Sequence, residues 1–277
     1  MTDVAVALKA ARAAGLASLD AQLLLARILE TTRTGLIAHD ERQLSAAEEH
    51  RWNDALARRT DGEPLAYLLG EKEFAGLMLE VTSDVLVPRP ETETLVDWAA
   101  ELLAAMPAGP RSLVDLGTGS GAIALAVAAR CPDARVTATD ASPTALDVAR
   151  RNAARHVARV EFVDGSWWEP LGDRTFDVVL SNPPYIAAGD PHLAALRHEP
   201  VAALSPGGDG LGALRQIVAG AGRHLHPGGW LLVEHGFDQD VAVRALLADA
   251  GFVAVASRAD LAGRPRVSGG RAPAQPG

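Results

Sequence analysis

A short polar and aromatic segment, Asn182 to Tyr185, follows an apolar run, residues 176–181, that is typical of a buried strand. The Asn182 side-chain oxygen and the Pro183 carbonyl can each accept a hydrogen bond from a planar N–H group. Two such acceptors hold an amide or aryl-amine nitrogen and aim its lone pair at an electrophilic carbon. Pro183 and Pro184 stiffen the backbone, and Tyr185 offers a flat surface to a planar group. The segment predicts alkylation of such a nitrogen, although taken alone it could be a proline-bent turn.

A glycine-rich turn precedes this segment, between a predicted buried strand and a predicted helix. The turn consists of Gly117, Thr118, Gly119, Ser120 and Gly121. Glycines at such a turn let the backbone pass close under a ligand, where a side chain would collide. Because dinucleotide-binding folds use a similar turn, the motif alone leaves NAD and S-adenosylmethionine both possible.

Two acidic residues bear on the choice of ligand. Asp115, two residues before the first glycine, is expected to face the cationic amino acid end of S-adenosylmethionine, which has no pyrophosphate. Asp140 closes the next predicted strand, where a carboxylate accepts hydrogen bonds from ribose hydroxyls. Asp140 suits either cofactor, whereas Asp115 favours S-adenosylmethionine and therefore transfer of a methyl group.

A tandem tryptophan follows the third predicted strand. The segment Asp164 to Trp168 lies where folds of this kind place a polar residue and an apolar wall around adenine. We expect Trp167 to lie beside the cofactor. Either tryptophan could instead fill the core.

The elements that must position these residues alternate between strands and helices. Strands are predicted at 112–116, 136–140, 160–163, 176–181, 230–235 and 252–257, and helices near 121–130, 143–155, 210–225 and 239–250. The alternation predicts an α/β unit with a parallel sheet covered by helices on both faces. Ser142 and Pro143 predict the cap and first residue of the helix that follows Asp140. The tail, residues 269–277, is rich in Gly, Pro and Ala and is expected to fray.

The region before this unit has a different pattern. Residues 1–73 are predicted to form a small helical domain, in which Ser45 and Glu48 make a capping-box pattern. Residues 74–90 predict a β-hairpin linker, with apolar residues of short period between Phe74 and Val87. The helical domain carries little chemistry, so packing or partner recognition is its expected role.

The composition narrows the class of protein. The 277 residues include 48% hydrophobic and 22% charged residues, which is typical of a soluble globular protein. No apolar run is long enough for a membrane span, and no secretory signal is apparent, so a cytoplasmic location is expected. The single cysteine, Cys131, excludes an internal disulfide, and no metal site is expected. A net charge of −9 disfavours direct nucleic-acid binding.

With these residues in view, the sequence resembles the protein-(glutamine-N5) methyltransferases that modify bacterial peptide chain release factors. The most specific part of the resemblance is the segment Val87-Pro88-Arg89-Pro90-Glu91-Thr92-Glu93. The remaining shared segments, between about Arg58 and Val267, are Gly62 to Gly70, Asp115 to Gly121, Ser181 to Tyr185, Gly208 to Leu211, Pro227 to Gly229, Glu234 to Gly236 and Gly263 to Val267.

The resemblance implies a seven-stranded, Rossmann-like class I methyltransferase domain over residues 91–268, after a helical domain that recognises the substrate. It implies methyl transfer from S-adenosylmethionine to the side-chain amide of the glutamine in a Gly-Gly-Gln motif. The implied cofactor contacts are the glycine turn, Asp140, Trp167 and Asn182. Asn182 to Tyr185 would hold the glutamine amide. We expect a monomer whose partners are release factors, without direct nucleic acid or membrane contact.

Several alternatives share part of this pattern. An adenine-N6 methyltransferase of nucleic acids uses the same catalytic logic but needs a basic face and a pocket for a flipped base. A sister family methylates glutamine on a ribosomal protein, and there the Pro-Arg segment lacks the Glu-Thr-Glu continuation. A NAD-dependent dehydrogenase leaves Asn182 to Tyr185 unexplained. A non-enzymatic binding module is the remaining alternative.

Overall fold

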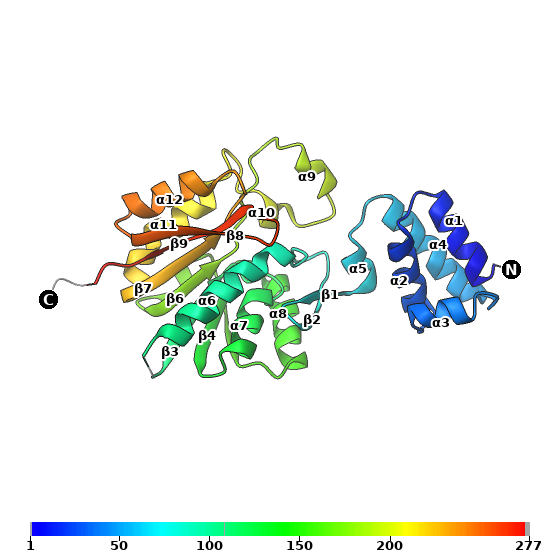
Figure 1. Ribbon diagram of the computed structural model, residues 1–277, viewed down its shortest axis with the longest axis horizontal. Helices are drawn as coiled ribbons and strands as arrows, with labels where there is room; N and C mark the ends of the chain where they lie inside the picture. Colours follow the sequence, from blue (N-terminus) through cyan, green and yellow to red (C-terminus); the bar gives the residue numbers. More distant parts are fainter. Residues whose placement is uncertain (1, 108, 275–277) are drawn as a thin grey trace. The chain divides into compact units, whose positions relative to one another are not determined.

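The computed structural model describes residues 2–107 and 109–274. The chain divides into two compact units, Met1–Lys72 and Glu73–Gly277, which are considered separately below (Figure 1). The first unit is helical and the second contains the sheet.

The N-terminal unit is a bundle of helices with its own apolar core. Its helices in the described part are α1 (Val4–Ala13), α2 (Ser18–Ile28), α3 (Arg33–Ala38), α4 (Ala46–Thr60) and α5 (Leu65–Leu69). Leu24, Leu25 and Trp52 are almost fully buried at its centre. The predicted capping box opens α4, because Glu48 N donates to Ser45 Oγ at 3.3 Å and Ser45 N donates to Glu48 Oε2 at 2.8 Å.

The hairpin lies earlier in the chain than its apolar pattern predicted. Its strands are β1 (Glu71–Phe74) and β2 (Leu77–Glu80). Ala75 and Gly76 form the turn with φ values of 51° and 84°, and two-residue hairpin turns favour this left-handed backbone. The turn therefore sets the register of the hairpin. Val81, Val85 and Val87 are buried but lie outside regular strands.

Within the described residues, the C-terminal unit contains a seven-stranded sheet with the order β5-β4-β3-β6-β7-β9-β8. Its strands are β3 (Arg111–Leu116), β4 (Ala134–Asp140), β5 (Val160–Asp164), β6 (Phe176–Ser181), β7 (Leu225–Glu234), β8 (Val253–Ala259) and β9 (Pro265–Arg271). Strands β3 to β7 pair in parallel, and β9 runs antiparallel to both β7 and β8. The predicted α/β class is confirmed. The strand order reverses between β3 and β6, a switch point at which open sheets bind ligands.

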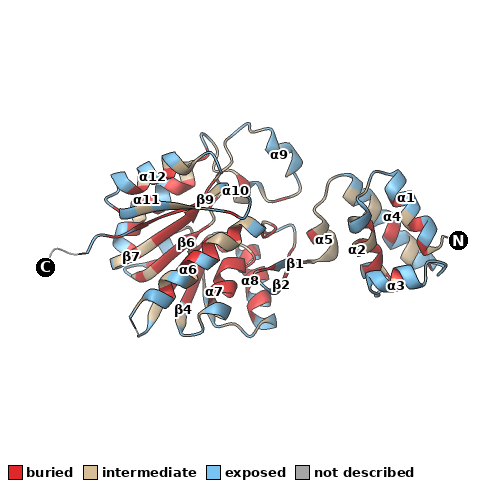
Figure 2. Ribbon diagram, viewed as in Figure 1, coloured by how far each residue is buried: buried red, intermediate tan, exposed pale blue. Residues whose placement is uncertain are grey.

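Helices cover both faces of the sheet, and the strands are largely buried between them (Figures 1 and 2). The helices are α6 (Glu93–Ala105), α7 (Ala122–Arg130), α8 (Pro143–Arg155), α11 (Gly212–His224) and α12 (Asp240–Asp249), with shorter turns η1 (Pro90–Thr92), η2 (Glu169–Leu171), α9 (His192–Ala195) and α10 (Val201–Leu204). Leu113, Val178 and Leu180 share a core with α6 and α7. Val114 and Val179 share the opposite core with α11 and α12. Alternate strand residues thus point to opposite faces, as the pleat requires.

The expectation of a fraying tail is wrong for its first residues. Gly269, Gly270 and Arg271 complete β9 and pair with Leu232, Leu231 and Trp230 of β7, respectively. A Cβ added at Gly269 would lie 2.4 Å from Leu232 Cδ2, and one at Gly270 would lie 2.8 Å from Phe252 Cβ. Glycine here allows close packing, although its strand propensity is low. Residues 275–277 of that tail lie outside the described residues.

In the part of the chain that the structure describes, no helix has both the length and the apolar character required to cross a membrane.

Candidate cofactor and substrate site

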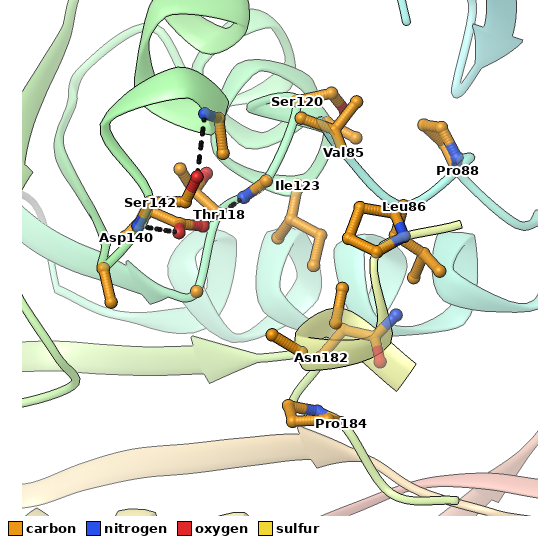
Figure 3. Close-up of a pocket in the computed structure, with 18 of the residues that line it drawn as sticks. Val85, Leu86, Pro88, Thr118, Ser120, Ile123, Asp140, Ser142, Asn182 and Pro184 are labelled. Atoms are coloured by element: carbon orange, nitrogen blue, oxygen red, sulfur yellow. Dashed lines mark hydrogen bonds between the residues drawn. The ribbon is translucent and has the colours of Figure 1, made fainter. Parts of the chain in front are cut away.

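A cavity of about 360 Å³ opens at the carboxyl ends of β3, β4 and β6, where the sheet was expected to bind a ligand. Figure 3 shows Thr118 and Asp140 on one side of the cavity and Asn182 and Pro184 on another. Most of the predicted site residues line it, namely Gly117, Thr118, Gly119, Ser120, Asp140, Trp167, Asn182 and Pro184. The structure therefore brings most of the glycine turn, Asp140, Trp167 and two residues of the Asn182 to Tyr185 segment to a single cavity.

The glycine turn lies against the cavity with a left-handed backbone. Gly117, Gly119 and Gly121 have φ values of 73°, 55° and 82°. A Cβ at Gly117 would lie 3.1 Å from the Trp167 ring. Gly121 is not among the described residues that line the cavity, and a Cβ there would lie 3.2 Å from Ala149 Cβ of α8. Its predicted cofactor contact stays a prediction.

Asp140 lines the cavity and is held in place by backbone hydrogen bonds. Its Oδ2 accepts a hydrogen bond from Gly119 N at 2.8 Å and its Oδ1 accepts one from Ser142 N at 2.9 Å. Burial raises the pKa of Asp140, and these backbone hydrogen bonds oppose the rise. Ser142 Oγ caps α8 by accepting from Ala145 N at 3.2 Å, as its sequence predicted. The carboxylate is thus fixed at the junction of β4, α8 and the glycine turn.

Asp115 does not reach the cavity, contrary to expectation. It is fully buried in β3, where its Oδ2 accepts a hydrogen bond from Thr118 Oγ1 at 2.6 Å. Thr118 is the residue that lines the cavity in its place. Burial is the main cause that raises the pKa of Asp115 to about 7, and its Oδ1 has no hydrogen-bond partner in the described part.

The side chains of Trp167 and Trp168 lie in different environments. Trp167 has a φ of 47° and its ring lines the cavity beside Gly117. Trp168 points elsewhere, because its ring stacks on His224 with a centroid distance of 4.7 Å and its Nε1 donates to Gln216 O at 3.3 Å. Trp167 is therefore the tryptophan that can contact a cofactor.

The segment Asn182 to Tyr185 presents one side-chain amide to the cavity. Asn182 Nδ2 donates to Thr92 Oγ1 at 3.2 Å, which leaves Oδ1 as the amide group able to accept from a ligand. Pro184 lines the cavity, whereas Pro183 is buried and is not among the described lining residues. Tyr185 is likewise not among the described residues that line the cavity. Its hydroxyl donates to Glu234 Oε1 at 3.4 Å, and burial followed by the nearby Glu234 raises its pKa.

The segment Pro88 to Glu93 showed no evident chemistry in the sequence. In the structure, two of its residues make polar contacts beside the cavity. Thr92 binds the Asn182 amide, and Arg89 forms an ion pair with Glu199. Glu199 Oε2 also accepts from Val87 N at 3.0 Å, so this buried carboxylate joins the segment to the chain before α10. Glu199 therefore both anchors this segment through the backbone and forms a salt bridge with it.

The fold and the site together define a class I methyltransferase. Two family models match, "Methyltransferase small domain" over residues 92–210 and "PrmC N-terminal domain" over residues 3–70. Among solved structures, a methyltransferase from Pyrococcus furiosus has a TM-score of 0.53 at 21% identity, with 80% of this chain and 99% of that chain covered. The Thermus thermophilus 16S rRNA N2 G1207 methyltransferase has a TM-score of 0.53 at 17% identity, with 73% and 49% covered. At these identities the likeness shows the fold alone.

Relatives of known name are much more similar in sequence. The release factor glutamine methyltransferase of Xylella fastidiosa is 49% identical, with 97% of this chain and 98% of the relative covered. That of Burkholderia pseudomallei is 51% identical, with 97% of each chain covered. That of Bordetella pertussis is 52% identical, with 92% and 95% covered. The chain belongs to the release factor glutamine methyltransferase family.

Proposed function

We propose that this chain transfers a methyl group from S-adenosylmethionine to the side-chain N5 of the glutamine in the Gly-Gly-Gln motif of bacterial release factors. The observation that carries the proposal is the orientation of the Asn182 amide. Its Nδ2 is engaged by Thr92, so its Oδ1 is available at a cavity shared with the glycine turn. The family relationship supports a release factor as the substrate.

The cavity suits S-adenosylmethionine, which supplies an electrophilic methyl group on a sulfonium. Asp140 offers carboxylate oxygens to the two ribose hydroxyls. Trp167 supplies a flat apolar surface for the adenine. Gly117, which has no Cβ, leaves room for the Trp167 ring. The partial negative charge of Asp115, held beneath Thr118, favours a cationic amino acid end.

The chain's own contribution to the chemistry is the positioning of a poor nucleophile. An amide nitrogen has its lone pair delocalised into the carbonyl, and hydrogen bonds from its N–H groups to fixed acceptors favour pyramidalisation. Asn182 Oδ1 supplies one acceptor at the cavity. The carbonyl of the adjoining Pro183, which is not among the described lining residues, is the expected second acceptor. The methylated nitrogen is acidic enough to lose one proton to water, so no general base is required. Orientation alone contributes up to roughly 7–11 kcal/mol in well-aligned systems.

A protein substrate fits this chain better than a nucleic acid. The net charge of −9 opposes the electrostatic attraction on which binding to a phosphate backbone depends. We assign recognition of the release factor to the helical unit, where the "PrmC N-terminal domain" model matches. The protein is expected to act as a monomer in the cytoplasm, without a metal.

The assignment is tested by incubating the protein with labelled S-adenosylmethionine and a release factor, its Gln-to-Ala variant, or duplex DNA. Label on the release factor that disappears in the Gln-to-Ala variant supports the proposal. Label on DNA, or undiminished label on the variant, contradicts it.

The role of Asn182 is tested separately. Asn182→Ala should lower turnover by at least about 100-fold, which is typical of losing one preorganised polar contact to a reacting group. Binding of S-adenosylhomocysteine, followed by calorimetry, should change far less, because the other cofactor contacts remain. Normal turnover in this variant would remove Asn182 from the mechanism.

A further inference from the structure

The segment Asn182 to Tyr185 leaves the sheet at the end of β6, where its first anchor lies. Ser181, the last residue of β6, pairs with Leu116 of β3 and donates its Oγ to Leu116 O at 2.7 Å. Pro183 and Pro184 follow, and a proline has no N–H to donate. The prolines therefore cannot tie the segment to its surroundings by backbone donation, and its far end needs an anchor of its own.

The Gln239 side chain provides an anchor at the far end of this segment. Its Nε2 donates to Tyr185 O at 3.0 Å, and its Oε1 accepts from Gly236 N at 2.8 Å. A carboxamide nitrogen only donates and its oxygen only accepts, whereas a backbone N–H only donates and a carbonyl only accepts. The Gln239 amide therefore has one orientation in which both bonds form. The loop between β7 and α12 thus holds the carbonyl that ends the segment.

Ser205 anchors the next carbonyl in the same manner. Its Oγ donates to Ile186 O at 2.6 Å and accepts from Gly207 N at 3.1 Å. The single hydroxyl hydrogen is therefore used for Ile186 O. Ile186 N also donates to Leu204 O at 3.0 Å. Two side chains from different loops thus hold two consecutive carbonyls, those of Tyr185 and Ile186.

Gly210 shows how closely the chain packs around the Gln239 anchor. A Cβ at Gly210 would lie 2.4 Å from Tyr185 O and 3.1 Å from Gln239 Nε2. Gly210 is buried and has a φ of 81°, which a residue with a side chain rarely adopts. Two segments of the family resemblance, Gly208 to Leu211 and Glu234 to Gly236, therefore meet at the Tyr185 carbonyl.

We propose that Gln239, together with Ser205, positions the Asn182 to Tyr185 segment for methyl transfer. Both are positioning residues, since neither is among the described residues that line the cavity. The inference deepens the proposed function and rests on it for the identity of the substrate amide. It gives a task to the loop between β7 and α12, which the cofactor contacts leave without one.

The anchors restrict a segment that has little freedom of its own. Ser181 is fixed in the sheet and Gln239 holds the Tyr185 carbonyl, while the two prolines between them have φ fixed at about −65°. The side-chain oxygen of Asn182 and the carbonyl of Pro183 are then in place before the substrate arrives, so little reorganisation is needed during the reaction. Without the anchor the segment can shift, and a displacement of about 1 Å lowers a rate about 100-fold.

Two substitutions of Gln239 test the donor separately from the rest of the side chain. Gln239→Glu keeps the length and the acceptor for Gly236 N, but its carboxylate turns an acceptor toward Tyr185 O. We expect kcat for methylation of release factor to fall about 10- to 100-fold. Gln239→Leu removes both hydrogen bonds, and a comparable or larger fall is expected. Gln216→Glu is the matched control with wild-type kcat, because it makes the same change at an exposed residue of α11.

The Michaelis constant and the melting temperature separate a positioning role from a loss of structure. In Gln239→Glu the KM for S-adenosylmethionine should stay within about threefold while kcat falls, because the glycine turn, Asp140 and Trp167 are untouched. The Tm of this variant should stay within about 4 °C of the wild type. Ser205→Ala should show the same split with a smaller fall in kcat. Wild-type kcat in Gln239→Glu would overturn the proposal, as would a rise in KM without a fall in kcat.

An NMR measurement on the free protein keeps the test independent of the substrate. The chain has two tyrosines, Tyr67 and Tyr185, so labelling with 15N-tyrosine gives two backbone amide signals, which Tyr185→Phe assigns. The order parameter of the Tyr185 amide should be about 0.85 in the wild type and should fall toward about 0.6 in Gln239→Glu and Gln239→Leu. That of Tyr67, in the helical unit, should not change.

The two measurements distinguish failure of the inference from failure of the proposed function. If release factor is not methylated but the Tyr185 amide loosens in both variants, the proposed function fails and the anchor stands. If release factor is methylated and the Tyr185 amide stays equally ordered in both variants, the inference fails alone.

Discussion

The side chain of Asn152 is bonded to both backbone polar groups of Glu80. Its Oδ1 accepts from Glu80 N at 2.7 Å, and its Nδ2 donates to Glu80 O at 2.9 Å. The same Nδ2 donates to Ser120 O at 2.9 Å. Because Asn152 is fully buried in α8, one amide joins the hairpin strand β2 to the glycine turn. The geometry of the turn thus depends on the hairpin.

Replacing this amide should destabilise the C-terminal unit. Asn152→Ala leaves buried backbone groups of Glu80 and Ser120 without partners, and we expect the free energy of unfolding to fall by about 3 kcal/mol. Urea denaturation measures the change. Arg151→Ala is the matched control, because the neighbouring Arg151 pairs with the side chain of Glu80 at the surface. That variant should lose less than about 1 kcal/mol. Equal losses in the two variants would contradict a structural role for Asn152.

The tandem tryptophans should give opposite phenotypes. Trp167→Ala removes the ring beside Gly117, and we expect the Kd for S-adenosylhomocysteine to rise about tenfold with little change in Tm. Trp168→Ala removes the ring stacked on His224 and packed on Gly220, so it should lower Tm and leave the Kd nearly unchanged. Calorimetric titration and thermal unfolding of both variants decide the assignment. A larger Kd effect in Trp168→Ala would reverse it.

The ion pair between Arg89 and Glu199 should hold one wall of the cavity. Glu199→Ala leaves Val87 N without its acceptor and releases the segment that carries Pro200, Ala202 and Ala203 to the cavity. Amide hydrogen exchange over residues 199–204 should become faster, and cofactor binding should weaken. Glu169→Ala, a charge removal in η2, controls for the change in net charge. Unchanged exchange in the Glu199 variant would show that the wall does not depend on this pair.

The contribution of Asp115 to the stability of the cofactor-free protein should fall as the pH rises from about 4 to about 7. Burial raises the pKa of Asp115 to about 7 from an ordinary value near 3.8, so the folded state binds this proton more tightly than the unfolded state. The contribution of this group to the free energy of unfolding therefore decreases between these values, by up to about 4 kcal/mol. Asp115→Asn keeps an acceptor for Thr118 and removes the titration.

Urea denaturation at pH 5 and pH 8 measures this dependence. The difference between the two pH values should shrink in Asp115→Asn and persist in Asp133→Asn, which replaces an exposed carboxylate. Asp115→Asn should also be more stable than the wild type at pH 8. An unaltered pH dependence in Asp115→Asn would mean that the buried carboxyl does not titrate in this range.

Local patterns predicted much of the fold and the location of the site. The Ser45 capping box, the Ser142 cap and the strand over residues 176–181 all depend on neighbours within a few residues, and all three are present. Hairpin register was less predictable. The left-handed backbone at Ala75 and Gly76 decided it, and the apolar period did not.

The sequence by itself determined the reaction class, because the glycine turn, the acid after the next strand and the Asn182 segment are local motifs that parallel strands bring to one edge. Only the tertiary structure decided which residues meet there. Thr92 and Asn182 are 90 positions apart, and Asp115 lies behind Thr118 because strand burial directs it into the core. Hydrogen-bond partners are chosen by distance in space, which composition and periodicity do not specify.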